Sequence, residues 1–354
     1  QTFLAPGMLD TPKRCPLQNY NRRPIFHASF TLLVVVWLRC SDPLLGMTTL
    51  VLRPFSWTAR LGGRLARHGS AACAGDSGES ILRIAAFADG AVGGNPAGVA
   101  IRQAIPEEAD MRRVAAEVGF SETVFAAKSG AGWRVRYFSP ETEVAFCGHA
   151  TIALGAALAM KHGDGVFDLQ LNEANITVEG RRHADTFTGA LQSPRTSSYP
   201  ADPELVRRSL RLFGLTKEDL DSRIPPSIAE GGNRHLVLAL ASRAALADMS
   251  YDMDAGRELM NGAGLVTVIL ANAAGDRRFH VRNPFASGGV YEDPATGSAA
   301  AAFAGYLRDL EWPHGGRIDI VQGEDMGMRS HIVAEVPPEP GSSIRVAGAA
   351  RLME

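Results

Sequence analysis

Two acids lie directly before an uncharged segment in the stretch EDPATGSAAAAFAG, residues 292–305. Thr296-Gly297-Ser298 opens this segment and alanines continue it, which is the pattern of a buried helix. The N-terminus of a helix leaves backbone N–H groups unpaired and carries about half a positive charge, so it readily binds a carboxylate or a phosphate. Asp293 could orient a proton donor or hold a substrate hydroxyl or amine beside this start, or it could cap the helix.

A second start of the same kind is GHAT, residues 148–151, which also leads into a run of small apolar residues. If the two starts face each other, one cleft receives both helix ends and can hold the anionic groups of a substrate. The alternative is that Thr151, Thr296 or Ser298 caps its own helix. His149 could exchange a hydrogen bond with a substrate, or it could be a satisfied core residue.

Glu122 is the most specific single candidate for acid–base chemistry. If SETVF is a strand, Glu122 shares one face with Val124 and Ala126. A carboxylate among apolar neighbours is costly unless it is paired, and its pKa rises toward the range that suits proton transfer. The alternative is an ion pair with Arg134 or Arg136 on the next strand.

The elements that must position these residues occur twice. One half offers RVRYFSP, an acidic linker and the helix CGHATIALGAALA, and the other offers FHVRNPF, YEDPA and TGSAAAAFAGYL. We interpret this as an internal duplication, the alternative being a chance likeness between two buried helices. A helix without charge on any side is buried on all sides. The sequence therefore predicts an α+β fold of two similar domains, each a curved, mainly antiparallel sheet wrapped around a central helix.

The periodicity predicts the individual elements from residue 81 onward. The strand spacing does not suit right-handed βαβ crossovers, so a doubly wound parallel sheet is disfavoured. Helices are expected over 106–119, 148–163, 203–214 and 297–310. Strands are expected over 81–87, 97–101, 121–128, 133–140, 166–171, 175–180, 186–192, 233–240, 265–272, 277–285, 317–323, 328–336 and 343–352.

The chain divides by charge as well as by pattern. Residues 1–75 hold nine Lys/Arg against two acids, and residues 25–38 are an apolar run too short to span a bilayer comfortably. We predict an N-terminal extension over 1–79, either an Arg-rich targeting segment that allows organellar import or upstream sequence without function. The predicted domains are 81–195 and 196–354, with no membrane association of this body and a cytoplasmic location.

Composition and missing motifs exclude several classes of function. With 21% charged residues and a net charge of −2, nothing indicates a nucleic-acid surface. Cys147 is the one cysteine after residue 79, which excludes a disulfide framework or a Cys-based cluster there and favours inert packing for this thiol. Phosphate-loop, dinucleotide and serine-elbow motifs do not occur, and no histidines and acids have metal-ligand spacing. We therefore expect no cofactor and no metal.

Four motifs occur in order along the chain: GNPAGVAI (94–101), SETVF (121–125), RYFSPETEVAFCGHATIALG (136–155) and YEDPATGSAAAAFAGYL (291–307). Together, over about residues 81–350, they resemble the PhzF-like phenazine biosynthesis family of the diaminopimelate epimerase superfold. The stretch QGEDMGMRS departs from the family, which tends to have Arg-Pro before this serine. This departure weakens any substrate assignment that rests on that loop.

The resemblance implies an active site between two similar domains and a cofactor-free proton shift within a dihydro-hydroxyanthranilate. It implies that Glu122 is the general acid/base, that His149, Asp293 and Ser298 line the substrate, and that the protein forms a homodimer. We therefore expect a cofactor-independent isomerase of a small carboxylate substrate. Its predicted catalytic residues are Glu122, His149 and Asp293, and its predicted substrate-binding residues are Gly148, Gly297, Ser298, Thr296 and Asn95.

Two other functions stay open from the sequence. Cofactor-free racemases and epimerases use two opposed cysteines, one at each helix start, but the place that would match Cys147 holds Pro294-Ala295. A non-catalytic binding or regulatory protein could keep the fold without turnover, although the joint presence of the three catalytic candidates argues against it. Loops such as 226–232 and 284–290 are expected to shape the pocket.

Overall fold

The computed structural model describes residues 80–184 and 186–354. The predictions made for residues 1–79 lie outside these described residues. No helix of the described part is long and apolar enough for a membrane span. Its first half contains β1 (Leu82–Ala86), β2 (Asn95–Arg102), α1 (Glu108–Val118), β3 (Glu122–Ser129), β4 (Gly132–Phe138), β5 (Glu143–Val144), α2 (Gly148–His162), β6 (Gly165–Gln170), β7 (Asn175–His183) and β8 (Thr186–Arg195).

The second half follows the same plan with more helices. Short 3₁₀ turns lie at Lys217–Asp219, Ala286–Gly288 and Glu324–Met326. The other elements are β9 (Ser197–Pro200), α3 (Pro203–Leu212), β10 (Ser227–Glu230), β11 (Arg234–Ala239), α4 (Arg243–Ala247), α5 (Met253–Gly262), β12 (Thr267–Ala273), β13 (Arg278–Phe285), β14 (Val290–Asp293), α6 (Gly297–Asp309), β15 (Arg317–Gln322), β16 (Ser330–Glu335) and β17 (Ser343–Leu352).

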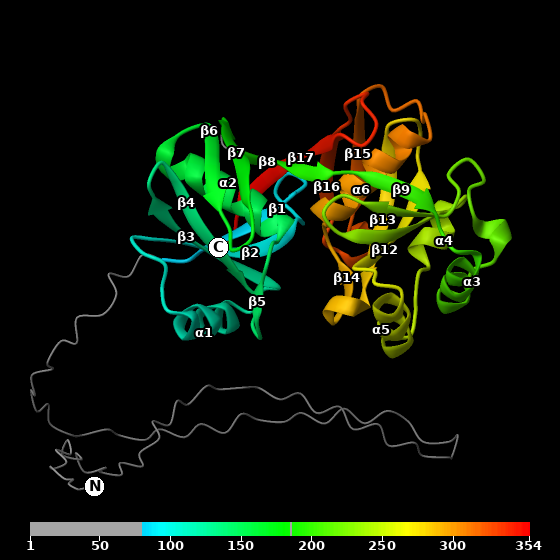
Figure 1. Cartoon of the computed structure of the whole chain (residues 1–354), viewed down its shortest axis with the longest axis horizontal. Helices are drawn as coiled ribbons and strands as arrows, with labels where there is room; N and C mark the ends of the chain where they lie inside the picture. The colour runs from blue at the N-terminus through cyan, green and yellow to red at the C-terminus, as the bar shows by residue number, and fades with distance from the viewer. Residues whose placement is uncertain (1–79, 185) are drawn as a thin grey trace, which may run out of the picture. The chain divides into compact units, whose positions relative to one another are not determined.

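Helix α2 is enclosed by the strands of the first half, as Figure 1 shows. Every residue from His149 to Ala159 is buried. The sheet comes so close that a Cβ on Gly180 would lie 2.1 Å from the carbonyl oxygen of Gly155, and one on Gly189 would lie 2.6 Å from that of Ile152. Only glycine permits such an approach, so the small residues of this half let the sheet close on its helix.

Helix α6 has the same surroundings in the second half. It packs against β9, β10, β16 and β17, and all of its residues from Ala299 to Arg308 are buried. A Cβ on Gly305 would lie 2.6 Å from Thr196. The predicted architecture of mainly antiparallel sheet around one central helix in each half is confirmed.

The order of strand pairing is also the same in the two halves. Strands β2 and β3 are parallel across α1, β3 and β4 are antiparallel, and β4 and β6 are parallel across α2. The corresponding pairs β11–β12, β12–β13 and β13–β15 repeat this order, with α4 and α5 in the first connection and α6 in the last. This agreement supports the internal duplication.

These four parallel pairs, within the residues that the structure describes, correct the prediction about crossovers. The spacing between the strands does accommodate a helix, since each parallel pair is joined through one or two of them. The sheet is nevertheless mixed and mainly antiparallel, so the conclusion against a doubly wound sheet holds.

The last strand joins the two halves. β17 pairs with β16 of the second half and with both β8 and β1 of the first, for example Val346 with Leu191 and Leu352 with Ile84. The division at residues 195 and 196 stays a prediction, because the described residues from 80 to 354 belong to one compact unit.

Candidate active site

The starts of α2 and α6 meet. A Cβ placed on Gly148 would lie 3.9 Å from the Cα of Gly297. Both glycines line one pocket of about 140 Å³, to which the first half contributes the beginning of β3 and the segment before α2. The second half contributes the beginning of β12, the end of β13 and the segment from β14 to α6. The expected arrangement of two helix ends at one pocket is therefore present.

Neither helix start has a side-chain cap. The residue before α2, Cys147, and the residue before α6, Thr296, make no side-chain hydrogen bond to their helices' first backbone amides. The Thr151 hydroxyl donates instead to the Cys147 carbonyl oxygen, at 2.7 Å. The capping alternative is thus wrong for these threonines, and amides of the first turns can serve a ligand.

Glu122 opens strand β3 at the edge of the pocket. Its carboxylate lies 3.4 Å from Nε2 of His149, and the two side chains are 17% and 7% exposed. Val124 and Ala126 belong to the core around α2, so Glu122 faces that core as the strand alternation predicts. Since Arg136 pairs with Glu108 and Glu143, it is not the partner of Glu122, and the ion-pair alternative is wrong for this arginine.

The His149 ring is held between two further groups. Its Nδ1 lies 3.3 Å from the Cys147 sulfur, and its Nε2 lies 3.5 Å from the Ser121 hydroxyl. Burial, and next the Glu122 carboxylate, raise the pKa of the Cys147 thiol well above its ordinary value. The thiol is therefore protonated at neutral pH, which makes it a poor nucleophile or base.

Asp293 is fixed at the start of α6 by neutral donors. The Asn95 amide donates to its Oδ1 at 2.7 Å, and the Thr296 hydroxyl donates to its Oδ2 at 2.5 Å. Gln322 donates to the Asp293 carbonyl oxygen at 2.7 Å and accepts from the Thr296 amide at 3.2 Å. The predicted residues Asn95, Thr296 and Asp293 thus form one hydrogen-bonded group.

The pKa of Asp293 is raised from its ordinary value of 3.8 to about 6. Burial is the main cause; His149 and the hydrogen bonds from Thr296 and Asn95 oppose it, and Glu122 adds to it. A carboxyl that titrates near neutral pH suits acid–base chemistry. Among the described residues that line the pocket there is no lysine or arginine, so the donors available to an anion are amides, hydroxyls and the His149 ring.

The structure brings all eight predicted site residues to this pocket. Sequence reasoning missed Ser121, Gln322 and Asn233, although Ser121 lies in the SETVF motif and Gln322 opens the stretch QGEDMGMRS. It also missed that Glu122, Cys147 and His149 offer ligand atoms within 4.8 Å of one another, which is a geometry that could hold a metal ion. A metal bound there would have to displace the proton of the Cys147 thiol, because a metal ligand must be a thiolate.

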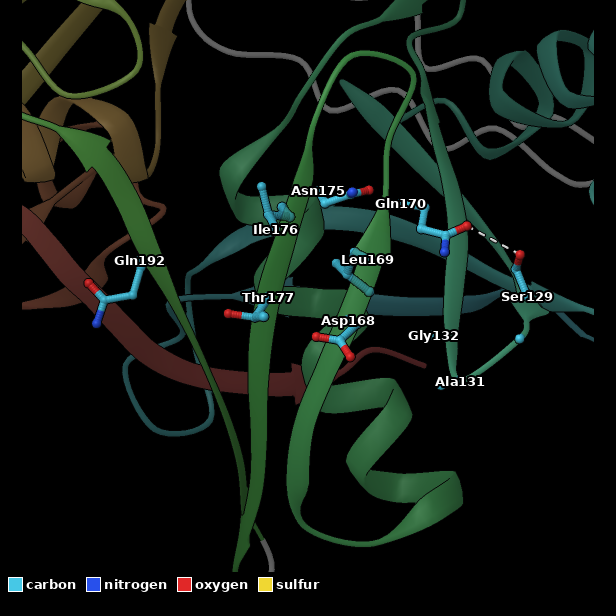
Figure 2. A pocket seen from close by; sticks show the side chains of 11 residues that line it. Ser129, Ala131, Gly132, Asp168, Leu169, Gln170, Asn175, Ile176, Thr177 and Gln192 are labelled. Carbon is cyan, nitrogen blue, oxygen red and sulfur yellow. Dashed lines mark hydrogen bonds between the residues drawn. The ribbon is translucent and has the colours of Figure 1, made fainter.

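A second hollow, which shares no residue with this pocket, lies over β6 and β7, and Figure 2 shows it. It is wider, about 680 Å³, and polar side chains such as Gln170, Asn175 and Thr177 surround it. Gln170 accepts a hydrogen bond from Ser129 there, at 3.2 Å. Asp168 is the one titratable residue among the described residues that line it, so it lacks the paired groups that proton transfer requires.

Comparison with known proteins agrees with this geometry. The family model for phenazine biosynthesis-like proteins, PhzC-PhzF, matches residues 84–354. An uncharacterized isomerase of Deinococcus radiodurans is 31% identical over 262 residues, which cover 72% of this chain and 85% of that protein. The trans-2,3-dihydro-3-hydroxyanthranilate isomerase of Pseudomonas fluorescens is 30% identical over 258 residues, which cover 71% and 88%.

Solved structures show the same fold. The phenazine biosynthesis protein of the PhzF family from Bacillus anthracis superimposes with a TM-score of 0.68 at 20% identity, covering 77% of this chain and 96% of that one. The fold is accordingly the α+β fold of diaminopimelate epimerase-like proteins, as the motifs predicted. The chain belongs to the phenazine biosynthesis-like (PhzC-PhzF) family, and it is an isomerase of the PhzF-like type.

Proposed function

We propose that this isomerase moves a proton within a small carboxylate substrate by general acid–base catalysis, without a cofactor, and that Glu122 carries the proton. The observation that supports this most directly is the place of Glu122. It lies at a pocket between two helix starts, 3.4 Å from the nearly buried His149. A positioned acid–base group of this kind accelerates proton transfer by about 10²–10⁴-fold.

The pocket's size and polarity favour a single ring that carries a carboxylate. Its volume is about 140 Å³, and in another protein a cavity of roughly 150 Å³ holds one benzene molecule. The curated relative from Pseudomonas fluorescens is named for trans-2,3-dihydro-3-hydroxyanthranilate, a six-membered ring with a carboxylate. We propose that substrate, or a ring carboxylate close to it, and hence a reaction of phenazine biosynthesis, for this chain.

The proposed reaction conserves all atoms. The Glu122 carboxylate takes a proton from a ring C–H, and the electron pair of that bond enters the ring as a double bond shifts. The helix amides at Gly148 and Gly297 stabilise the negative charge that builds up on the substrate carboxylate. Glu122 then returns the proton to another ring carbon. His149 and Asp293 are the other side chains at the pocket that can hold a proton during the shift. The pKa of Asp293 is about 6.

Two further parts of the proposal rest on family resemblance. A homodimer in the cytoplasm is expected, and light scattering of the purified chain distinguishes it from a monomer of 37.7 kDa. A non-catalytic role in binding or regulation is the competing function, and the following experiment decides between the two.

The experiment is incorporation of deuterium from solvent into trans-2,3-dihydro-3-hydroxyanthranilate, followed by mass spectrometry and NMR. The wild-type protein should label the ring carbon that receives the proton, and Glu122→Gln should label it about 10²–10⁴-fold more slowly. Glu117→Gln is the matched control, since Glu117 lies on α1 and pairs with Arg113 at the surface.

The control should keep wild-type labelling. Equal, slow labelling by the wild-type protein and Glu122→Gln would contradict catalysis and favour the binding role. If labelling is fast in both, the proton passes through another group and the assignment of Glu122 is wrong.

A further inference from the structure

The loop between β10 and β11 is built against the first turns of α6. It consists of Gly231, Gly232 and Asn233, and the Gly231 amide donates to the Asn233 carbonyl oxygen at 3.2 Å. A Cβ on Gly231 would lie 2.8 Å from the backbone nitrogen of Ala302, so glycine is required for this approach. The loop therefore holds Asn233 beside the start of α6.

Asn233 makes a directed contact there. Its Nδ2 donates to the Ser298 hydroxyl oxygen at 3.1 Å, and both residues line the pocket. Among the described residues, Asn233 is the one hydrogen-bond partner of the Ser298 hydroxyl. A hydroxyl has one proton to give, and a neighbour that donates to its oxygen leaves that proton free for another acceptor.

We propose that Asn233 is a positioning residue that sets Ser298 as a hydrogen-bond donor to the substrate. The Ser298 hydroxyl and the free backbone amides at the start of α6 then act together as donors. They bind a carboxylate oxygen, which accepts hydrogen bonds and donates none. This inference rests on the proposed function and sharpens it. The substrate's carboxylate lies at the α6 start, and the ring carbons that exchange the proton lie toward Glu122.

The surroundings of Asn233 fit a site made of neutral donors. Two residues after Asn233, in β11, His235 is fully buried, and its Nδ1 lies 2.8 Å from the hydroxyl of Thr267, which also lines the pocket. Burial lowers the pKa of His235 to about 3, so it carries no charge near neutral pH. A carboxylate on this side therefore depends on hydroxyl and amide donors, and the loss of one should be measurable.

The test is binding of two stable probes, anthranilate and its neutral amide, anthranilamide, to the full chain by fluorescence titration. The wild-type protein should bind anthranilate more tightly. Ser298→Ala should weaken anthranilate binding by roughly 10-fold, as expected for one hydrogen bond to a charged group, and should remove most of the preference. Asn233→Ala should weaken it by a smaller factor, about 3- to 10-fold.

The double variant separates positioning from a general structural role. If Asn233 acts through Ser298, adding Asn233→Ala to Ser298→Ala should cause no further loss, whereas independent effects multiply. Asn233→Asp is the isosteric second variant, because its carboxylate accepts the Ser298 proton instead of directing it to the ligand. It should weaken anthranilate more than anthranilamide. Asn175→Ala, in the hollow of Figure 2, is the matched control and should bind both probes as the wild type does.

The outcomes are distinguishable. Equal binding of both probes by the wild-type protein, or independent effects of Asn233→Ala and Ser298→Ala, would overturn the role of Asn233 and leave the proposed isomerase to its deuterium test. If the wild-type protein binds neither probe, the positioning role and the proposed ring carboxylate both fail. Melting temperatures of each variant identify any loss that comes from unfolding.

Discussion

The starts of α2 and α6 have the same construction but different chemistry. Each begins with a glycine, and each is buried along its length. The α2 start carries His149, which lies 3.4 Å from Glu122. The α6 start carries Ser298 and is preceded by Asp293, which Asn95 and Thr296 fix by hydrogen bonds. The α2 start thus carries the Glu122–His149 pair, and the α6 start carries hydroxyl and amide groups together with the titratable Asp293.

This difference indicates how a duplicated fold can bind its substrate in one orientation. Two identical ends would bind a symmetric ligand and supply the same chemistry from both sides. Here the side with Glu122 can move a proton, while the side with Ser298 can hold an anion in place. The pocket between them therefore distinguishes the reacting end of a substrate from its anchored end.

The largest expected effect separates the two starts kinetically. Glu122→Gln should lower kcat by about 10²–10⁴-fold with little change in KM, since it removes proton transfer and leaves binding intact. Ser298→Ala should raise KM by roughly 10-fold, because it removes a contact made to the bound carboxylate. Steady-state kinetics of both variants measures the split. Loss of kcat in both to the same degree would show that the starts share one role.

The next effect concerns the pH dependence of stability at the α6 start. The Asp293 pKa is about 6 in the folded chain against an ordinary 3.8, so folding takes up a proton between pH 4 and pH 6. The free energy of unfolding of the wild type should therefore fall, relative to Asp293→Asn, as pH rises through that window. The expected change is about 3 kcal/mol.

Urea unfolding of the wild type and Asp293→Asn at pH 4, 5, 6 and 7 measures this difference. Subtracting the two curves cancels the carboxylates that titrate in both, such as Glu143, whose pKa Arg136 lowers. A difference that does not vary with pH would mean that the pKa of Asp293 is the same in the folded and unfolded chain, so that its hydrogen bonds and His149 balance the effect of burial.

A smaller effect tests whether the close approach of the two helices matters. An added Cβ meets its nearest neighbours at 3.9 Å for Gly148 and at 3.6 Å for Gly297, which is ordinary contact. Gly148→Ala and Gly297→Ala should therefore fold, and each should be more stable by about 0.5–1 kcal/mol because alanine favours the helix. Gly148→Ala should also weaken anthranilate binding by roughly 10-fold, because its methyl group lies between the two helix starts. Calorimetry and titration measure the two effects, and unchanged binding would show that the ligand lies elsewhere.

The fold could be predicted from the sequence where a pattern forces burial. The uncharged runs from 148 and from 297 can only be interior helices, and the sheets around them follow. The sequence analysis did not predict the short helix α4 or the helix α5, which begin after Ser242 and Asp252. Both caps are visible in the sequence as a polar residue before a helical run, so that signal was present.

The site could be predicted in its residue types but not in its contacts. Glu122, His149 and Asp293 stand out by charge in apolar surroundings. The hydrogen bonds that fix Asp293 come from Asn95, almost 200 residues away in the sequence, and from Gln322 at the end of β15, where the stretch QGEDMGMRS departs from the family pattern. Such partners depend on how the two halves meet, which no local pattern encodes. Asn233 was missed for the same reason, because only its packing on α6 brings it to Ser298.

The smallest expected effect is at the residues that precede the two helices. Cys147 and Thr296 hold the same position before α2 and α6, which corrects the expected match of Cys147 with Pro294-Ala295. The residue that corresponds to the thiol therefore carries a hydroxyl and not a second thiol. Cys147→Ser should keep kcat within about 3-fold, because the buried thiol is protonated and serine suits the position before a helix. A loss of 100-fold or more, with the melting temperature retained, would make the thiol a base. In that event the α2 start would supply a second base beside Glu122, and the assignment of proton transfer to Glu122 alone would be wrong.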